Sequence, residues 1–85
     1  MKYIKEYNDI KTGKYVILHV EPGNGMPLKL KDQIGIVKST KDDLMTVYFP
    51  NKNETLYLIH KNFAKYKSNN IEDLEQILNV KKYNL

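Results

Sequence analysis

The feature that most constrains this chain is a glycine inside a run of β-branched residues. Ile34-Gly35-Ile36-Val37 follows a polar pair, Asp32-Gln33, and reads as a strand that begins at a turn. A glycine weakens a strand, so its presence inside one indicates a bulge, a sharp bend or a close approach by another part of the chain. Small barrels need such a bend where a strand passes from one sheet into the next. The run therefore favours a small, strongly bent antiparallel barrel.

Strand and turn patterns alternate on both sides of this run. Lys14 to Val20 is rich in β-branched and aromatic residues and predicts the first strand. The loop from Glu21 to Pro27 contains two prolines and two glycines, which block a helix or a central strand. Polar turns separate two further predicted strands, Leu44 to Phe49 and Thr55 to His60. A short connector is expected from Asn62 to Lys67.

The two ends of the chain predict helices. The helix expected over residues 69–80 has an apolar stripe at helical spacing, formed by Ile71, Leu74, Ile77 and Leu78. Asn69 or Asn70 can cap its first N–H groups, and the acidic residues of its first turn suit the helix dipole. About three turns cannot hold alone, so the stripe packs either on the barrel or on a partner. Met1 to Lys11 also has helical spacing, and this segment either docks as a short helix or stays extended.

Length and composition bound the class of protein. The 85 residues form one domain, 1–85, with a barrel over 12–66 and the helix over 69–80. There is no cysteine, so disulfides and thiolate ligands are excluded. His19 and His60 match no metal-ligand spacing. No apolar run approaches the roughly 20 residues of a membrane span, and no signal-peptide core is present. We expect a cytoplasmic protein without a metal or a cofactor.

All of the positively charged side chains of the protein are lysines. The 14 basic residues include no arginine, and against 10 acidic residues they leave a net charge of +4. Arginine supplies the bidentate fork that reads guanine edges, whereas lysine acts as a hydrated point charge. Sequence-specific reading of DNA is therefore disfavoured. Weak attraction to a nucleic-acid backbone remains compatible with the charge.

The motifs that could carry chemistry have simpler structural interpretations. Gly23-Asn24-Gly25 lacks a third glycine and a following Lys-Ser or Lys-Thr pair, so it indicates a turn and not a phosphate-binding loop. Asp42-Asp43 is typical of a solvated hairpin turn. No serine or threonine lies in a nucleophile motif. The sequence predicts no catalytic residue and no metal ligand.

The predicted core follows from strict alternation along the strands. It comprises Val16, Leu18, Ile36, Val47, Phe49, Leu56 and Leu58, with Leu74 and Ile77 docking on one side. The same alternation turns Tyr15, Tyr48 and Tyr57 outward. These rings either lie under the helices or form an exposed aromatic platform for a peptide or for nucleic-acid bases.

The loop from Glu21 to Lys29 is the second candidate contact region. Met26 is expected to be an exposed apolar tip between two prolines, with Asn24 and Lys29 beside it. The candidate binding residues are therefore Tyr15, Tyr48, Tyr57, Met26, Asn24 and Lys29.

A series of short motifs from Gly13 to Tyr66 resembles a domain of unknown function found in phages and other mobile elements. The matching motifs are Gly13, Val16-Ile17-Leu18, Glu21-Pro22, Gly35-Ile36-Val37, Asp42-Asp43 and Leu56-Tyr57-Leu58-Ile59. Phe63 stands where members of that family carry a closing aromatic residue. The chain departs from the family at Asp32, where a second glycine is usual, and at Pro50-Asn51-Lys52, where Asp-Asn-Gly is common. The resemblance implies an SH3-like barrel, as does a looser similarity to the KOW-type barrels of transcription and translation factors.

Together these patterns predict a mainly β protein, a small SH3-like antiparallel β-barrel with a C-terminal helix. The predicted function is a non-enzymatic protein-binding module, an accessory protein of a phage or mobile element that regulates or inhibits a host protein such as a defence effector. The alternative is a small barrel that binds single-stranded DNA or RNA with weak sequence preference. No feature of the sequence sets the oligomeric state.

Overall fold

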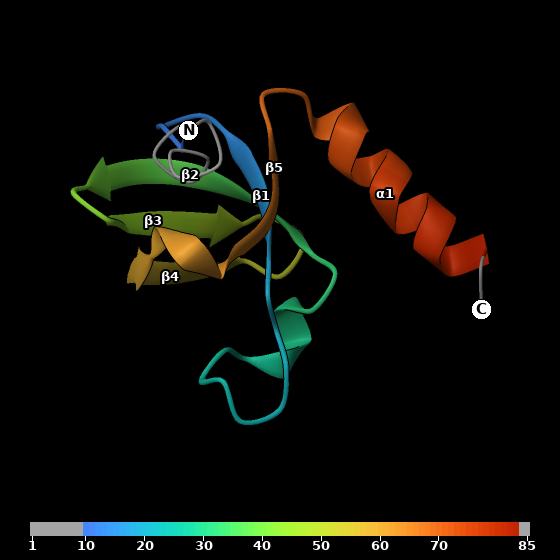
Figure 1. Ribbon diagram of the computed structural model, residues 1–85, viewed down its shortest axis with the longest axis horizontal. Helices are drawn as coiled ribbons and strands as arrows, with labels where there is room; N and C mark the ends of the chain where they lie inside the picture. Colours follow the sequence, from blue (N-terminus) through green and yellow to red (C-terminus); the bar gives the residue numbers. More distant parts are fainter. Residues whose placement is uncertain (1–9, 84–85) are drawn as a thin grey trace, which may run out of the picture.

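The computed structural model describes residues 10–83, and within this range the chain forms five strands and one α-helix (Figure 1). The elements are β1 (Tyr15–Leu18), η3 (Leu28–Leu30), β2 (Ile34–Lys41), β3 (Leu44–Phe49), β4 (Glu54–His60), η4 (Lys61–Phe63), β5 (Ala64–Ser68) and α1 (Ile71–Tyr83). The mainly β class with a C-terminal helix is confirmed. The N-terminal helix expected over Met1 to Lys11 lies outside the described residues, except for Ile10 and Lys11.

The strands form one antiparallel sheet in the order β4-β3-β2-β1-β5. Strands β1 to β4 follow one another as neighbours, and β5 returns to pair with β1 (Figure 1). The connector expected from Asn62 to Lys67 is therefore wrong, because this segment is the turn η4 followed by a fifth strand. Among the described strands β4 and β5 have one neighbour each, so the sheet is open at both edges.

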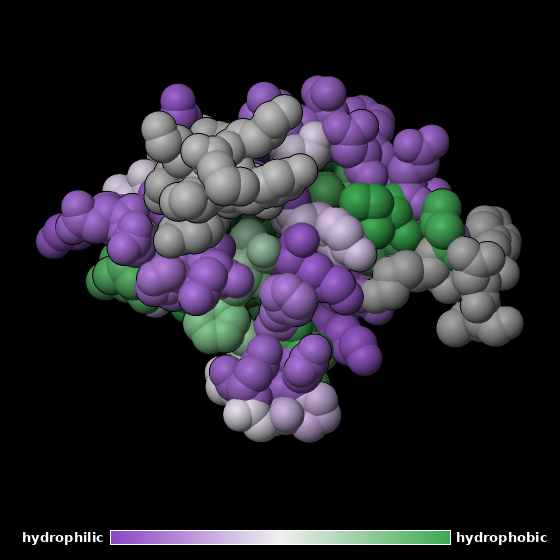
Figure 2. Space-filling view, viewed as in Figure 1, coloured by the Kyte–Doolittle hydropathy of each residue, from purple (hydrophilic) through white to green (hydrophobic). Residues whose placement is uncertain are grey.

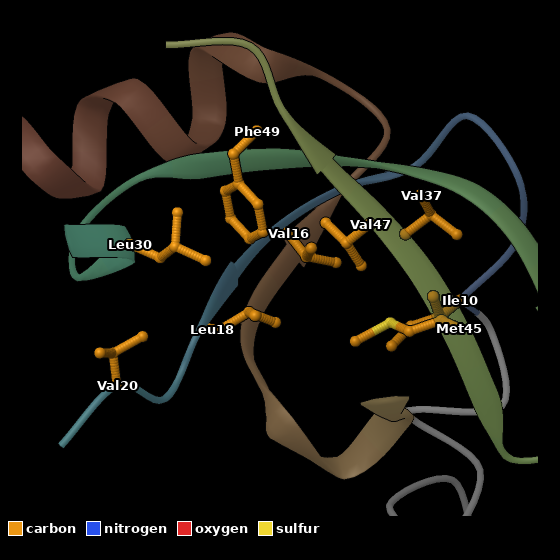
Figure 3. Close-up of a cluster of buried hydrophobic side chains, with 9 residues drawn as sticks. All are labelled: Ile10, Val16, Leu18, Val20, Leu30, Val37, Met45, Val47 and Phe49. Atoms are coloured by element: carbon orange, nitrogen blue, oxygen red, sulfur yellow. The ribbon is translucent and has the colours of Figure 1, made fainter. Parts of the chain in front are cut away.

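The buried core lies on one face of the curved sheet, here called the inner face. Its side chains converge from β1, β2, β3 and the segments just before and after β1 (Figure 3). The cluster comprises Ile10, Val16, Leu18, Val20, Leu30, Val37, Met45, Val47 and Phe49. The predicted inward orientation of Val16, Leu18, Val47 and Phe49 is confirmed, because β1 and β3 keep a regular alternation.

Two predicted core positions are wrong. On β2 the inward residue is Val37, and Ile36 lies half-buried on the outer face. On β4 Leu58 is 58% exposed, although Leu56 does pack against the core. On β2 the predicted inward and outward positions are shifted by one residue. Ile34, Ile36 and Val37 are all apolar, so the sequence does not show which of them points inward. The error on β4 has a different cause, a bulge, which is described below.

Helix α1 covers part of the outer face. It contacts β5, β1 and β2, and its Leu74 is 1% exposed. Ile17 of β1 also has only 1% of its surface exposed, on the face opposite Val16 and Leu18. The stripe of α1 therefore packs on the sheet at Leu74, as in one of the two alternatives expected, whereas Ile77 and Leu78 are half-buried. The Ser68 hydroxyl holds the corner before the helix, accepting the Asn70 N–H at 3.0 Å and donating to the Asp73 carboxylate at 2.6 Å.

Candidate functional site

The described part of the chain offers little for chemistry. No group of three or more histidine or acidic side chains within it could hold a metal ion. Its hollows are open to the surface, such as one of about 430 Å³ lined by Lys11 to Lys14 and Asn69. None of the described helices combines the length and the apolar composition needed to cross a membrane.

The loop after β1 is braced, and Met26 is not its exposed apolar residue. Met26 is half-buried and packs against the core, so its expected exposure is wrong. The reason is Asn24, whose side-chain amide donates to the His19 carbonyl at 2.9 Å and accepts the Met26 N–H at 3.0 Å. These two bonds fold the loop back over the core. In this position Asn24 stabilises the loop.

Lys29 connects this loop region to the start of β4. Its Nζ lies 2.7 Å from Oε1 of Glu54, and both side chains are partly exposed. The ammonium charge of Lys29 is therefore engaged within the protein.

The strand register brings two of the three candidate tyrosines together. Tyr15 of β1 and Tyr48 of β3 both pair with Ile36 of β2, so all three side chains lie on the outer face. All three are half-buried. The Tyr48 hydroxyl lies 3.3 Å from Oδ1 of Asn53 in the following turn. This row is neither a bare aromatic platform nor wholly covered, an outcome between the two expected alternatives.

Tyr57 lies at a bulge on the edge strand β4. The register between β3 and β4 shifts between Met45 and Val47, so that Tyr57 and Leu58 together face Thr46. Leu58 has a φ of 54°, and its N–H donates to the Thr46 hydroxyl at 3.3 Å. The extra residue places two consecutive side chains outside and returns Ile59 to the core side.

Both side chains of this pair are largely exposed, although a tyrosine ring and a leucine side chain are large and mainly apolar. Tyr57 is 74% exposed and Leu58 is 58% exposed. We call these two residues the β4 bulge pair. Hydrophilic residues cover most of the described surface on the side shown in Figure 2, where hydrophobic side chains also emerge beside α1. Leu58 was missed as a surface residue because Leu56-Tyr57-Leu58-Ile59 is apolar throughout and fits either phase of alternation.

The two edges of the sheet differ in chemistry. Thr55 to Ile59 on β4 contains no charged residue and no proline. On β5, by contrast, Lys65 and Lys67 flank Tyr66, and the Lys65 ammonium lies 5.6 Å from the centre of the Tyr66 ring. Lysines on an edge strand discourage pairing with another chain. Of the two edges, β5 is the one protected by lysines, whereas β4 carries a bulge and exposes uncharged side chains.

Comparison of the chain with protein-family models, curated proteins and solved structures gave no match.

Proposed function

We propose that this chain is a non-enzymatic protein-binding module whose contact surface is centred on the β4 bulge pair, Tyr57 and Leu58. The observation that carries the proposal is the backbone of Leu58. A left-handed conformation costs an ordinary residue roughly 1–2 kcal/mol, and Leu58 adopts it at φ 54° while remaining largely exposed. Strain of this kind is held in place by the surrounding structure and is concentrated at functional sites.

The side chains of the pair suit a protein contact. A tyrosine at an interface combines a large apolar ring with a hydrogen-bonding tip and loses little conformational entropy. Tyrosine is enriched among the residues that dominate binding energy. Burying Leu58 against a partner would recover the apolar surface that folding leaves in water. Burial of Tyr57 and Leu58 against a partner therefore contributes favourable binding free energy that the isolated chain cannot gain.

The proposal includes the SH3-like barrel and the accessory role implied by the sequence resemblance. Four consecutive antiparallel strands, the short turn η4 and the return of β5 to β1 support the barrel. In the accessory role, the module occupies a site on a host protein and thereby regulates or inhibits it.

The test is capture of a partner from host lysate by the tagged chain, read by mass spectrometry with three baits. The baits are the parent, Leu58→Asn and the matched control Leu28→Asn. Leu28 is 59% exposed, nearly the same as Leu58, but it has no positive φ. We expect the parent and Leu28→Asn to enrich the same protein and Leu58→Asn to lose at least about ninety per cent of it, a tenfold loss of affinity. Retention of every partner by folded Leu58→Asn would overturn the proposal.

Binding of single-stranded nucleic acid is the second candidate function. It is favoured by the exposed ring of Tyr57, on which a base could stack, and by the net charge of +4. Fluorescence anisotropy with single-stranded and duplex oligonucleotides at two salt concentrations separates the candidates. Electrostatic affinity is greatest at low salt, so the absence of binding at about 50 mM salt rejects this second function.

A further inference from the structure

We propose that Asn24 is a site of spontaneous deamidation, and that its conversion to aspartate or isoaspartate opens the loop after β1. The inference follows from the side-chain contacts of Asn24 and from the glycine that succeeds it. It does not involve the β4 bulge pair, so it is independent of the proposed function and is tested separately.

The reactive pair is Asn24-Gly25. Asn24 is the one asparagine in the sequence that is followed by glycine. Asparagine is thermolabile because the main-chain nitrogen of the next residue can attack its side-chain amide carbon. A side chain on that next residue hinders the attack, and glycine has none. The sequence therefore offers the least hindered nucleophile at this position.

The structure leaves the Gly25 nitrogen accessible. Gly25 is exposed, and even a Cβ atom added to it would meet nothing within 4 Å. Within residues 10–83 the Gly25 N–H donates to no acceptor. Water can therefore reach this N–H group and remove its proton, and no hydrogen bond of the fold has to break first.

The side-chain amide of Asn24 is held by two hydrogen bonds that favour the attack. Its Oδ1 accepts the Met26 N–H at 3.0 Å, and its Nδ2 donates to the His19 carbonyl at 2.9 Å. When a nucleophile adds to Cγ, negative charge develops on Oδ1, and a positioned N–H donor stabilises that charge. The Met26 N–H therefore lies where the reaction needs a donor.

The reaction consumes only water. The deprotonated Gly25 nitrogen forms a bond to Cγ of Asn24, and the bond between Cγ and Nδ2 breaks. The side-chain nitrogen takes a proton from water and leaves as ammonia, and the product is a cyclic imide. Water then opens this ring at either of its two carbonyl carbons, which gives aspartate or isoaspartate. The net change is one amide plus water to one carboxylic acid plus ammonia.

The product loses the contacts that fold the loop back over the core. An ionised carboxylate has no proton to donate. In aspartate, one of its oxygens would replace Nδ2 beside the His19 carbonyl oxygen, where two acceptors repel each other. In isoaspartate the main chain also gains a methylene group, which displaces Met26 relative to Asn24. Met26, which packs against the core, is therefore released more often in either product.

Peptide mass mapping of the protein during prolonged incubation tests the site. We expect Asn24 to convert at least about tenfold faster than Asn51 and Asn53, with release of ammonia and loss of one unit from the net charge of +4. Alkaline pH should accelerate the reaction. Conversion in the folded protein should be at least as fast as in urea at the same pH, because only the fold supplies the Met26 N–H. Equal rates at the three asparagines, or slower conversion in the folded protein than in urea, would overturn the site.

Oxidation of Met26 by dilute hydrogen peroxide tests the opening of the loop. We expect Met26 to react at least about tenfold faster in Asn24→Asp and in the aged protein than in the fresh parent, the equivalent of 1.4 kcal/mol. Asn51→Asp adds the same charge in an exposed turn and should leave this rate unchanged. Met45, which is 0% exposed, reports on the core and should stay unreactive. Equal rates at Met26 in all four samples, or faster oxidation of Met45 as well, would overturn a local opening.

Discussion

Gly35 lies directly against the ring of Phe49 in the core. A Cβ atom at Gly35 would come within 2.8 Å of Phe49 Cε2, and it would also overlap Cγ1 of Val47. The glycine is therefore required by the close approach of β2 to the side chains of β3. This close approach is one of the three reasons that the sequence suggested for a glycine in this strand.

We expect Gly35→Ala to destabilise the protein by about 1–3 kcal/mol, the usual cost of overpacking a well-packed core. Urea denaturation measures the change. Ser39→Ala, at an exposed position of the same strand, is the control and should lie within about 0.5 kcal/mol of the parent. A Gly35→Ala protein as stable as this control would contradict the packing described.

We expect Leu18→Ala to lower the free energy of unfolding by about 2–5 kcal/mol, because it leaves a cavity in the core. The same truncation at Leu58 should change stability by less than about 1 kcal/mol, since that side chain is 58% exposed. Thermal and denaturant unfolding of both variants provides the comparison. Equal losses at the two positions would restore the inward assignment of Leu58.

We expect Leu58→Asn to leave stability unchanged or to raise it by up to about 1 kcal/mol. Asparagine tolerates the left-handed conformation better than leucine does, and little packing is lost. Leu28→Asn should bring no such gain, because Leu28 has no backbone strain to relieve. A gain in melting temperature together with a loss of binding is the outcome expected if the strain serves a contact. A clear loss of stability in Leu58→Asn would mean that the leucine stabilises the fold.

We expect Asn24→Ala to destabilise the loop after β1 by about 1–2 kcal/mol, because the His19 carbonyl and the Met26 N–H each lose a partner. Amide hydrogen exchange at Met26 should accelerate about tenfold, the equivalent of 1.4 kcal/mol. Asn51→Ala, in an exposed turn, is the matched control. Unchanged exchange at Met26 would show that the loop is held by other contacts.

The sequence pattern predicted an element correctly where each of its residues clearly suits either a buried or an exposed position. The strand β3 occurs at the predicted residues, Leu44 to Phe49, because it alternates between a buried and a half-buried face. The C-terminal helix begins at Ile71, two residues after the predicted start, and its Leu74 is buried as its stripe requires. The candidate site was only partly predictable. Tyr57 was identified as an outward residue, whereas Leu58 beside it was assigned to the core.

The sequence by itself determined the mainly β class, the positions of the strands β1 to β4 and the helix, and it limited the role of Gly35 to a bulge, a bend or a close approach. These follow from composition and periodicity within a few residues. Tertiary structure alone decided which residue of Ile36 and Val37 faces inward, because α1 and the core cover both faces of β2 and leave no alternation to read. It also folded Met26 onto the core and placed the bulge at Tyr57 and Leu58. A bulge depends on how one strand fits its neighbour, and four apolar residues in a row are compatible with either register.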